Sequence, residues 1–307
     1  MRQTARAVRR ASTGGAAVRD WRTIPHAELE HHFVPRLAIP DASQTFERFA
    51  KLSAAARPSL PGPFDVPYGA DPLETCDVHA APPGAADPPL VVFVHGGYWR
   101  ALDKRDHDFV VAGLRASGFS VVNVNYPLAP GVSVTRICES VEAAVRFVAA
   151  RREAWGLGAG RALALFGHSA GAHAVAHTAA ALADDVALAG VVEVSGVYDL
   201  RVVRELPSVQ CDVRLGADEA AALDCTARAP GAPAYLSVGA LEPAGWRGQT
   251  AARHDALAAA GAAPRVSLVD DAHHFSVLEK AVDAGTPEGL AVADFIRRVF
   301  RKSGSPR

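Results

Sequence analysis

The chain has almost no net charge and no long apolar run. Its 307 residues carry a formal net charge of −1, which leaves no electrostatic footprint for nucleic acid or for an acidic membrane surface. The longest apolar stretches, such as 90–94 and 190–194, have the length of strands, well short of the roughly 18 residues that a membrane helix needs. We therefore expect neither nucleic acid nor a membrane as a partner.

Cysteine is also scarce. The four cysteines are Cys76, Cys138, Cys211 and Cys225. They show no C-x-x-C spacing, and they are too few to form a disulfide framework in a chain of this length. Free thiols in a reducing compartment are the simplest interpretation, so we expect a cytoplasmic protein.

The head of the chain is rich in arginine and lacks the apolar core of a secretory signal. The arginines that precede the first acidic residue, Asp20, are Arg2, Arg6, Arg9, Arg10 and Arg19. We expect residues 1–20 to form a disordered basic tail, with a transit-like or nucleic-acid-binding arm as the alternatives. Residues 21–302 are expected to form a single domain.

Short apolar runs alternate with helical patterns from residue 90 onward. The expected strands are Leu90–His95, Ser120–Asn125, Ala162–Gly167, Gly190–Ser195, Ala234–Gly239 and Arg265–Val269. The expected helices are Asp106–Ser117, Val134–Trp155, Ala170–Leu182, Gly248–Ala260 and Pro287–Arg301. Strands that are apolar throughout and separated by helices indicate an α/β fold, in which helices cover both faces of a mostly parallel sheet.

Three segments depart from this alternation. Residues 44–56 predict a helix that covers the surface, and residues 64–80 predict an early hairpin. Residues 196–233 join one expected strand to the next with far more residues than the usual connection of about four to six. Such an excursion predicts a small cap or binding loop above the strand ends.

Gly167-His168-Ser169-Ala170-Gly171 fits the pattern G-x-S-x-G between an apolar strand and an alanine-rich helix. A sharp turn from strand to helix exposes a serine hydroxyl at the carboxyl end of the sheet, and the glycines avoid clashes with the neighbouring elements. The helix N-terminus adds a positive dipole end near a developing oxyanion. This context predicts Ser169 as a nucleophile for acyl transfer.

A serine hydroxyl is a weak nucleophile and needs a base, and in sites of this kind the chain order is serine, acid, histidine. His273 and His274 follow the last expected strand, and His274 is the preferred base. Glu242 follows the preceding strand and is the expected acid, which would fix the imidazole tautomer. The rival acids are Asp199, Asp270 and Asp271.

His95-Gly96-Gly97-Tyr98-Trp99 follows the strand expected at 90–95. Glycines at such a turn let backbone N–H groups approach an oxygen without interference from Cβ atoms. We expect the N–H groups of Gly96, Gly97 and Ala170 to form an oxyanion hole, in which one donor contributes about 3 kcal/mol of transition-state stabilisation. Tyr98 and Trp99 either line the pocket mouth, where they would favour an aromatic substrate, or pack under the following helix.

His173 and His177 share one face of the helix after Ser169, because they are four residues apart. The glutamate of an H-E-x-x-H zinc motif is missing, since the segment reads His173-Ala174-Val175-Ala176-His177. We therefore expect no metal and no cofactor, with one histidine near the pocket and the other packed behind it.

Together these motifs resemble those of the kynurenine formamidase (arylformamidase) group of α/β-hydrolases, relatives of the hormone-sensitive-lipase-like esterases. The resemblance extends from about Phe33 to Glu279. The segments that carry it are Phe33-Val34-Pro35-Arg36, Asp65-Val66-Pro67-Tyr68-Gly69, His95–Trp99, Tyr126-Pro127-Leu128-Ala129-Pro130, Gly167–His173 and Ser195-Gly196-Val197-Tyr198-Asp199-Leu200. The combination of H-G-G-Y-W with S-G-V-Y-D-L is the most specific part of it.

The resemblance implies an α/β-hydrolase fold with Ser169 as nucleophile, His274 as base, and Gly96 and Gly97 as oxyanion donors. It maps the acid to Glu242, where members of the group usually carry aspartate. The implied substrate is a small acyl group on an aromatic amine, with N-formylkynurenine of tryptophan catabolism as the lead.

Other functions are compatible with the same residues. A general short-acyl carboxylesterase would use the same machinery, because pocket size discriminates by only about 1–3 kcal/mol per methylene. A non-catalytic small-molecule binder on the same fold is the third hypothesis, against which the intact serine and histidine positions argue. The expected partner is a small-molecule acyl substrate, and a homodimer is compatible with the sequence.

Overall fold

The computed structural model describes residues 20–84, 87–157 and 162–303. Most of the basic tail expected at residues 1–20 lies outside the described residues. Asp20, the last residue of that segment, caps a short 3₁₀ helix at Trp21–Thr23 by accepting a hydrogen bond from the Arg22 N–H. None of the helices within the described residues is both long enough and apolar enough to span a bilayer.

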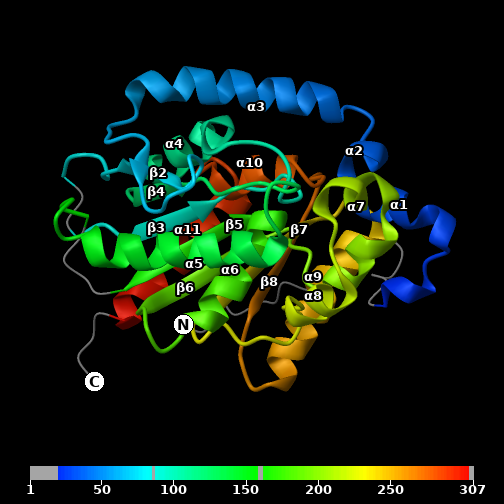
Figure 1. Cartoon of the computed structure of the whole chain (residues 1–307). Coiled ribbons are helices and arrows are strands. Elements are labelled where there is room, and N and C mark those ends of the chain that lie inside the picture. The colour runs from blue at the N-terminus through cyan, green and yellow to red at the C-terminus, as the bar shows by residue number, and fades with distance from the viewer. Residues whose placement is uncertain (1–19, 85–86, 158–161, 304–307) are drawn as a thin grey trace, which may run out of the picture.

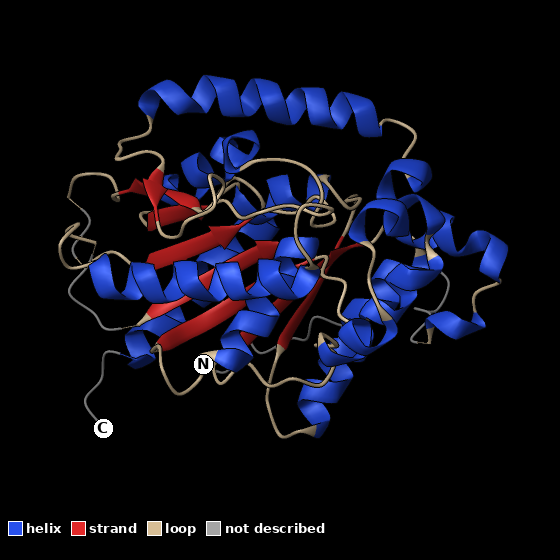
Figure 2. Cartoon of the chain, in the orientation of Figure 1, coloured by secondary structure: helices blue, strands red, loops and turns tan. Residues whose placement is uncertain are grey.

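An eight-stranded sheet forms the centre of the described structure (Figure 2). The strands are β1 (Val66–Pro67), β2 (Thr75–His79), β3 (Leu90–Val94), β4 (Ser120–Val124), β5 (Leu163–His168), β6 (Leu188–Val194), β7 (Ala234–Gly239) and β8 (Arg265–Val269). Their spatial order is β1-β2-β4-β3-β5-β6-β7-β8. Strands β3 to β8 pair in parallel, while β1 and β2 pair antiparallel. The mostly parallel α/β sheet expected from the sequence is confirmed.

Helices cover both faces of the sheet (Figure 1). One face carries α5 (Val134–Arg151), α6 (Ala170–Ala181) and α9 (Ala244–Ala259). The other face carries α4 (Asp108–Ala116), α10 (Ser276–Val282) and α11 (Pro287–Ser303). Helix α10, which begins two residues after His274, is the helix of these layers that the sequence patterns did not predict.

The central strand β3 is apolar throughout because each face of the sheet has its own hydrophobic core. Val92 and Val94 of β3 belong to the core under α5 and α6, whereas Val91 and Phe93 belong to the core under α4, α10 and α11. Successive strand residues point to opposite faces, and both faces are dry. This arrangement removes the polar–apolar alternation of a half-exposed strand and leaves a continuous apolar run.

Further helices lie above the carboxyl ends of the strands. Near the N-terminus these are α1 (Leu29–Phe33), α2 (Pro35–Ala38) and α3 (Ala42–Ala56). The segment 196–233, expected as a cap-like excursion, contains a 3₁₀ helix at Leu200–Glu205, α7 (Pro207–Val213) and α8 (Ala217–Ala222). The long α3 crosses the top of the molecule over α4 (Figure 1), and its Ser53 hydroxyl donates a hydrogen bond to the Asp106 carbonyl at 2.8 Å.

The buried histidines make the fold sensitive to acid. Burial lowers the pKa of His107 and the pKa of His173 to about 3, because desolvation disfavours the imidazolium form. Unfolded histidine binds its proton near pH 6.5, so the unfolded state holds more protons between about pH 6.5 and pH 3. The stabilising contribution of each neutral imidazole is complete above pH 6.5 and is lost progressively as the pH falls through this window.

We expect the free energy of unfolding to fall below pH 6.5 by about 1.4 kcal/mol per pH unit for each of these histidines. Urea titrations at pH 7.5, 5.5 and 4.5 measure this slope. The His173→Gln variant removes one titrating group and should flatten the slope by about 1.4 kcal/mol per pH unit. Equal stability of the unchanged chain at pH 7.5 and 4.5 would contradict the prediction.

Candidate active site

Ser169 lies in a strained turn between β5 and α6. Its backbone has φ 57° and ψ −119°, a left-handed conformation that costs energy in a residue with a Cβ atom. The flanking glycines make the turn possible. A Cβ on Gly167 would lie 2.3 Å from the Gly171 carbonyl oxygen, and a Cβ on Gly171 would lie 2.2 Å from the Val94 carbonyl oxygen. The turn therefore holds the Ser169 side chain beyond the carboxyl end of the sheet.

Ser169, His274 and Glu242 form a continuous chain of hydrogen bonds. The Ser169 hydroxyl donates to His274 Nε2 at 3.0 Å, and His274 Nδ1–H donates to Glu242 Oε2 at 2.8 Å. All three residues are buried, with 5%, 1% and 2% of the residue surface exposed in the order serine, histidine, glutamate. The loops that follow β5, β7 and β8 supply them, so the parallel sheet brings together residues far apart in the sequence.

The rival acids have other positions or partners. Asp199 accepts hydrogen bonds from the Trp21 indole and from Arg201. The backbone carbonyls of Asp270 and Asp271 accept hydrogen bonds from Lys280. Within the described part of the chain, Glu242 is the carboxylate that the structure places in hydrogen-bond contact with His274.

Glu242 is itself held by two donors. The Ser195 hydroxyl donates to Glu242 Oε1 at 2.5 Å, and the Gly239 N–H donates to the same oxygen at 2.7 Å. These two bonds occupy Oε1 and leave Oε2 for His274 Nδ1. The sequence motifs did not single out Ser195, although its position at the end of an expected strand was a signal that its side chain lies near the other strand ends.

The imidazole of His274 is held on two further sides. The ring of Trp246, on α9, lies 4.2 Å from the His274 ring, measured between centroids. His168, which precedes Ser169, donates its Nε2–H to the His274 carbonyl at 2.8 Å. These contacts fix both the backbone and the ring of His274, so its Nε2 stays directed at Ser169.

Gly96, Gly97 and Ala170 lie around Ser169. Gly97 has φ +114°, and a Cβ there would lie 2.1 Å from the Ala101 carbonyl oxygen, so the turn requires glycine. A Cβ on Gly96 would lie 3.1 Å from the Cβ of Ser169. Ala170 is the first residue of α6, where a helix leaves its N–H groups without intrahelical partners. The glycine turn at Gly96 and the first residue of α6 thus lie next to Ser169.

Ser169 and His274 open into a cavity of about 330 Å³. Its lining residues are Val34, Pro35, Arg36, Phe46, Phe49, Gly97, Tyr98, Arg100, Ala101, Leu102, His107, His168, Ser169, Asp212, His274 and Phe275. Helices α2 and α3 supply one wall and α7 contributes Asp212. The helix expected at 44–56 as a surface cover therefore also lines the cavity, and the 196–233 segment reaches it through one side chain.

The sequence of this chain is similar to those of known proteins. Residues 76–211 match the family model described as BD-FAE. The kynurenine formamidase of Danio rerio is 29% identical over 282 residues, covering 86% of this chain and 94% of that protein. The kynurenine formamidase of Salmo salar is 31% identical over 197 residues, covering 59% and 63%.

Two solved structures agree with the sheet and its helices. A candidate thioesterase from Silicibacter sp. is 27% identical with a TM-score of 0.74, covering 87% of this chain and 99% of that one. An esterase of the bacterial hormone-sensitive lipase family is 18% identical with a TM-score of 0.60, covering 85% and 99%. The chain has the α/β-hydrolase fold. The strained turn at Ser169 lies at the carboxyl edge of the sheet, where enzymes of this fold carry their nucleophile.

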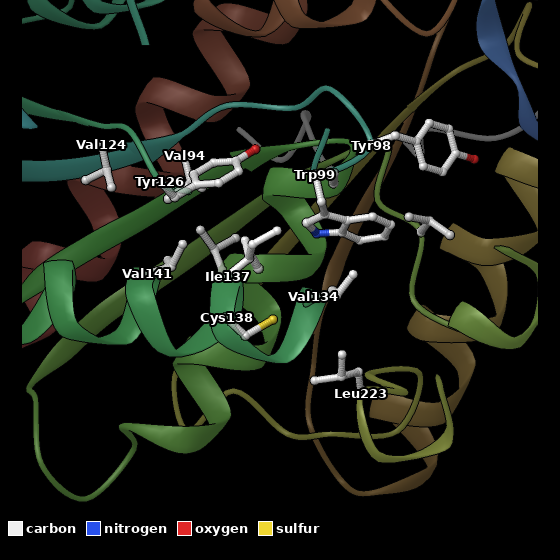
Figure 3. Packing of buried hydrophobic residues seen from close by; sticks show 14 of the residues in the cluster. Val94, Tyr98, Trp99, Val124, Tyr126, Val134, Ile137, Cys138, Val141 and Leu223 are labelled. Carbon is white, nitrogen blue, oxygen red and sulfur yellow. The ribbon is translucent and has the colours of Figure 1, made fainter. Parts of the chain in front are cut away.

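The two aromatic residues after the glycines have different positions. Tyr98 lines the cavity, and its hydroxyl donates to the Phe33 carbonyl at 2.5 Å. Trp99 is fully buried in the core under α5, and Figure 3 shows its indole above Val134, with Tyr98 turned away. The prediction that Trp99 lines the pocket mouth is wrong, because the large apolar indole is buried in the core instead.

His173 and His177 do not line the cavity that contains Ser169. His173 is fully buried, and its Nε2–H donates to the Leu223 carbonyl at 2.9 Å. His177 lies 3.2 Å from the Glu142 carboxylate. The prediction that one of them lies near the pocket is wrong, since neither lines the cavity that contains Ser169. No group of three or more His, Cys, Asp or Glu side chains in the described ranges is arranged as metal ligands.

Proposed function

We propose that this α/β-hydrolase is a serine hydrolase that cleaves a small acyl group, most specifically the formyl group of an aryl formamide. The observation that carries the proposal is the chain of hydrogen bonds from Ser169 through His274 to Glu242, which begins at the wall of a cavity. A hydroxyl, an imidazole and a carboxylate in this order are the parts that acyl transfer requires.

The proposed reaction has two steps. Ser169 Oγ attacks the carbonyl carbon while His274 Nε2 takes the hydroxyl proton, and the N–H groups of Gly96, Gly97 and Ala170 stabilise the resulting oxyanion. His274 then gives this proton to the departing amine, and the C–N bond breaks to leave a formyl ester on Ser169. Water, deprotonated by His274, attacks the ester. The bond between Ser169 Oγ and the formyl carbon then breaks, and His274 returns the proton to Oγ as formate leaves. Glu242 stabilises the imidazolium in both steps.

Two observations support an aromatic formamide as the substrate. The cavity has aromatic walls made by Phe46, Phe49 and Phe275, with Tyr98 beside them, and its volume of about 330 Å³ suits a single small ligand. The relatives from Danio rerio and Salmo salar are kynurenine formamidases. N-formylkynurenine, an aromatic formamide, is therefore the first substrate to test.

Kinetics on a substrate panel test the proposal. We expect kcat/KM for N-formylkynurenine to exceed that for p-nitrophenyl acetate, butyrate and hexanoate, with ester activity falling as the acyl chain lengthens beyond the small acyl site. Cleavage of the esters without cleavage of N-formylkynurenine would replace the formamidase by a short-acyl carboxylesterase. Failure of a fluorophosphonate probe to label Ser169 would exclude both and favour a binding protein.

A further inference from the structure

Charged side chains stand at the mouth of the cavity, above walls that are mainly apolar. Arg36 on α2, Arg100 after the glycine turn and Asp212 on α7 line the same cavity as Ser169. We call these three residues the charged rim. They come from segments far apart in the chain, and α2 and α7 lie at the same end of the molecule (Figure 1).

Arg36 is a cation without a carboxylate partner in the described ranges. Its guanidinium stacks over the ring of Phe46, 4.1 Å from the centroid, and Phe46 lines the cavity too. A guanidinium held against an aromatic face keeps its N–H donors at the edge free for a ligand. Arg36 is therefore oriented at the mouth and available for an anionic group.

Arg100 and Asp212 form an ion pair within the charged rim. Arg100 Nη1 donates to Asp212 Oδ2 at 2.6 Å and to the Ser208 carbonyl at 2.5 Å. These bonds tie the glycine turn to α7 and fix where the two charges lie. Both side chains are still partly exposed, 24% for Arg100 and 45% for Asp212, so each can accept a second partner from solution.

We propose that the charged rim is a subsite for an α-amino carboxylate at the end of the substrate opposite the acyl group. The two guanidiniums bind the carboxylate, which they match in planar geometry and charge, and Asp212 binds the ammonium group. The inference rests on the proposed function, because it takes Ser169 as the reacting end of the site. A neutral aryl formamide or simple ester gains nothing from the rim, so the rim determines specificity.

Binding measurements test the subsite without requiring turnover. Kynurenine carries the α-amino carboxylate, 2-aminoacetophenone lacks this group, and 4-(2-aminophenyl)-4-oxobutanoate keeps the carboxylate but lacks the ammonium. By calorimetry we expect kynurenine to bind at least about tenfold more tightly than 2-aminoacetophenone, the scale of one charge-assisted contact. Arg36→Gln should remove most of this preference. Asp212→Asn should reduce the preference for kynurenine over the oxobutanoate.

Arg48→Gln is the matched control, because Arg48 is an exposed arginine of α3 that pairs with Glu279 and does not line the cavity. This variant should keep the preference of the unchanged protein. Equal affinity of the unchanged protein for kynurenine and 2-aminoacetophenone would overturn the subsite. An equal loss of the preference for kynurenine in Arg36→Gln and Arg48→Gln would also overturn it. A retained preference in a protein that does not hydrolyse N-formylkynurenine would overturn the formamidase proposal and support the subsite.

Discussion

Ser169→Ala is expected to lower kcat by about 10⁴- to 10⁶-fold while the protein stays folded. Without the serine hydroxyl no acyl-enzyme can form, and most of the rate enhancement by the hydrogen-bonded triad is lost. The substitution deletes one oxygen and leaves the Cβ atom, so the strained turn and the glycine contacts are unchanged. Steady-state kinetics on N-formylkynurenine and p-nitrophenyl acetate measure the loss, and thermal unfolding checks the fold.

A buried serine elsewhere provides the control. Ser140 on α5 shares a hydrogen bond of 2.9 Å with the Tyr68 hydroxyl and does not line the cavity, so Ser140→Ala should retain activity. Fluorophosphonate labelling should disappear in Ser169→Ala and persist in Ser140→Ala. Substantial turnover by Ser169→Ala would assign the nucleophile to another residue and end the proposed mechanism.

Glu242→Gln is expected to lower kcat by about 10³- to 10⁴-fold, the scale seen when the acid of a serine-protease triad becomes an amide. The Gly239 N–H can only donate, so it fixes the amide oxygen at the position of Oε1. The amide NH₂ then faces His274 Nδ1 and donates to it. His274 must carry its proton on Nε2, where it can no longer accept the proton of Ser169.

Two comparisons separate this effect from a general loss of packing. Ser195→Ala removes one of the two donors to Oε1 and leaves the Gly239 N–H in place. Ser195→Ala should lower kcat by about tenfold or less, the scale of one hydrogen bond. Asp199→Asn should retain activity, because Asp199 pairs with Arg201 and Trp21. A larger loss in Asp199→Asn than in Glu242→Gln would move the acid to Asp199.

Local sequence patterns were sufficient to predict most of the fold. Both faces of β3 are covered, so its five residues are all apolar, and the sequence shows this directly as a run that predicts a buried parallel strand. The turn at Ser169 was also visible, because its steric limits require glycines at fixed positions next to the serine. Patterns of this kind depend on neighbours within a few residues and can be interpreted without tertiary contacts.

Contacts between distant segments could not be predicted from local sequence patterns. Tyr98 and Trp99 are adjacent and chemically similar, yet one lines the cavity and the other is buried in the core. Helix α10 is only seven residues long, too short to show a full amphipathic pattern. Helices α2 and α3 line the cavity because they cross the strand ends, which no local feature of their sequences indicates.

The amino-acid sequence by itself determined the layered α/β architecture and the chemistry-bearing turns at Gly96 and Ser169, because periodicity and glycine placement are local consequences of backbone sterics. The tertiary structure alone decided which carboxylate contacts His274 and which charges stand at the cavity mouth. The sequence favoured Glu242 over three rival aspartates without excluding them, and the hydrogen bond of 2.8 Å between Glu242 and His274 distinguishes it from them. Such distances follow from how separate strands and loops pack together, and this packing is a property of the whole fold.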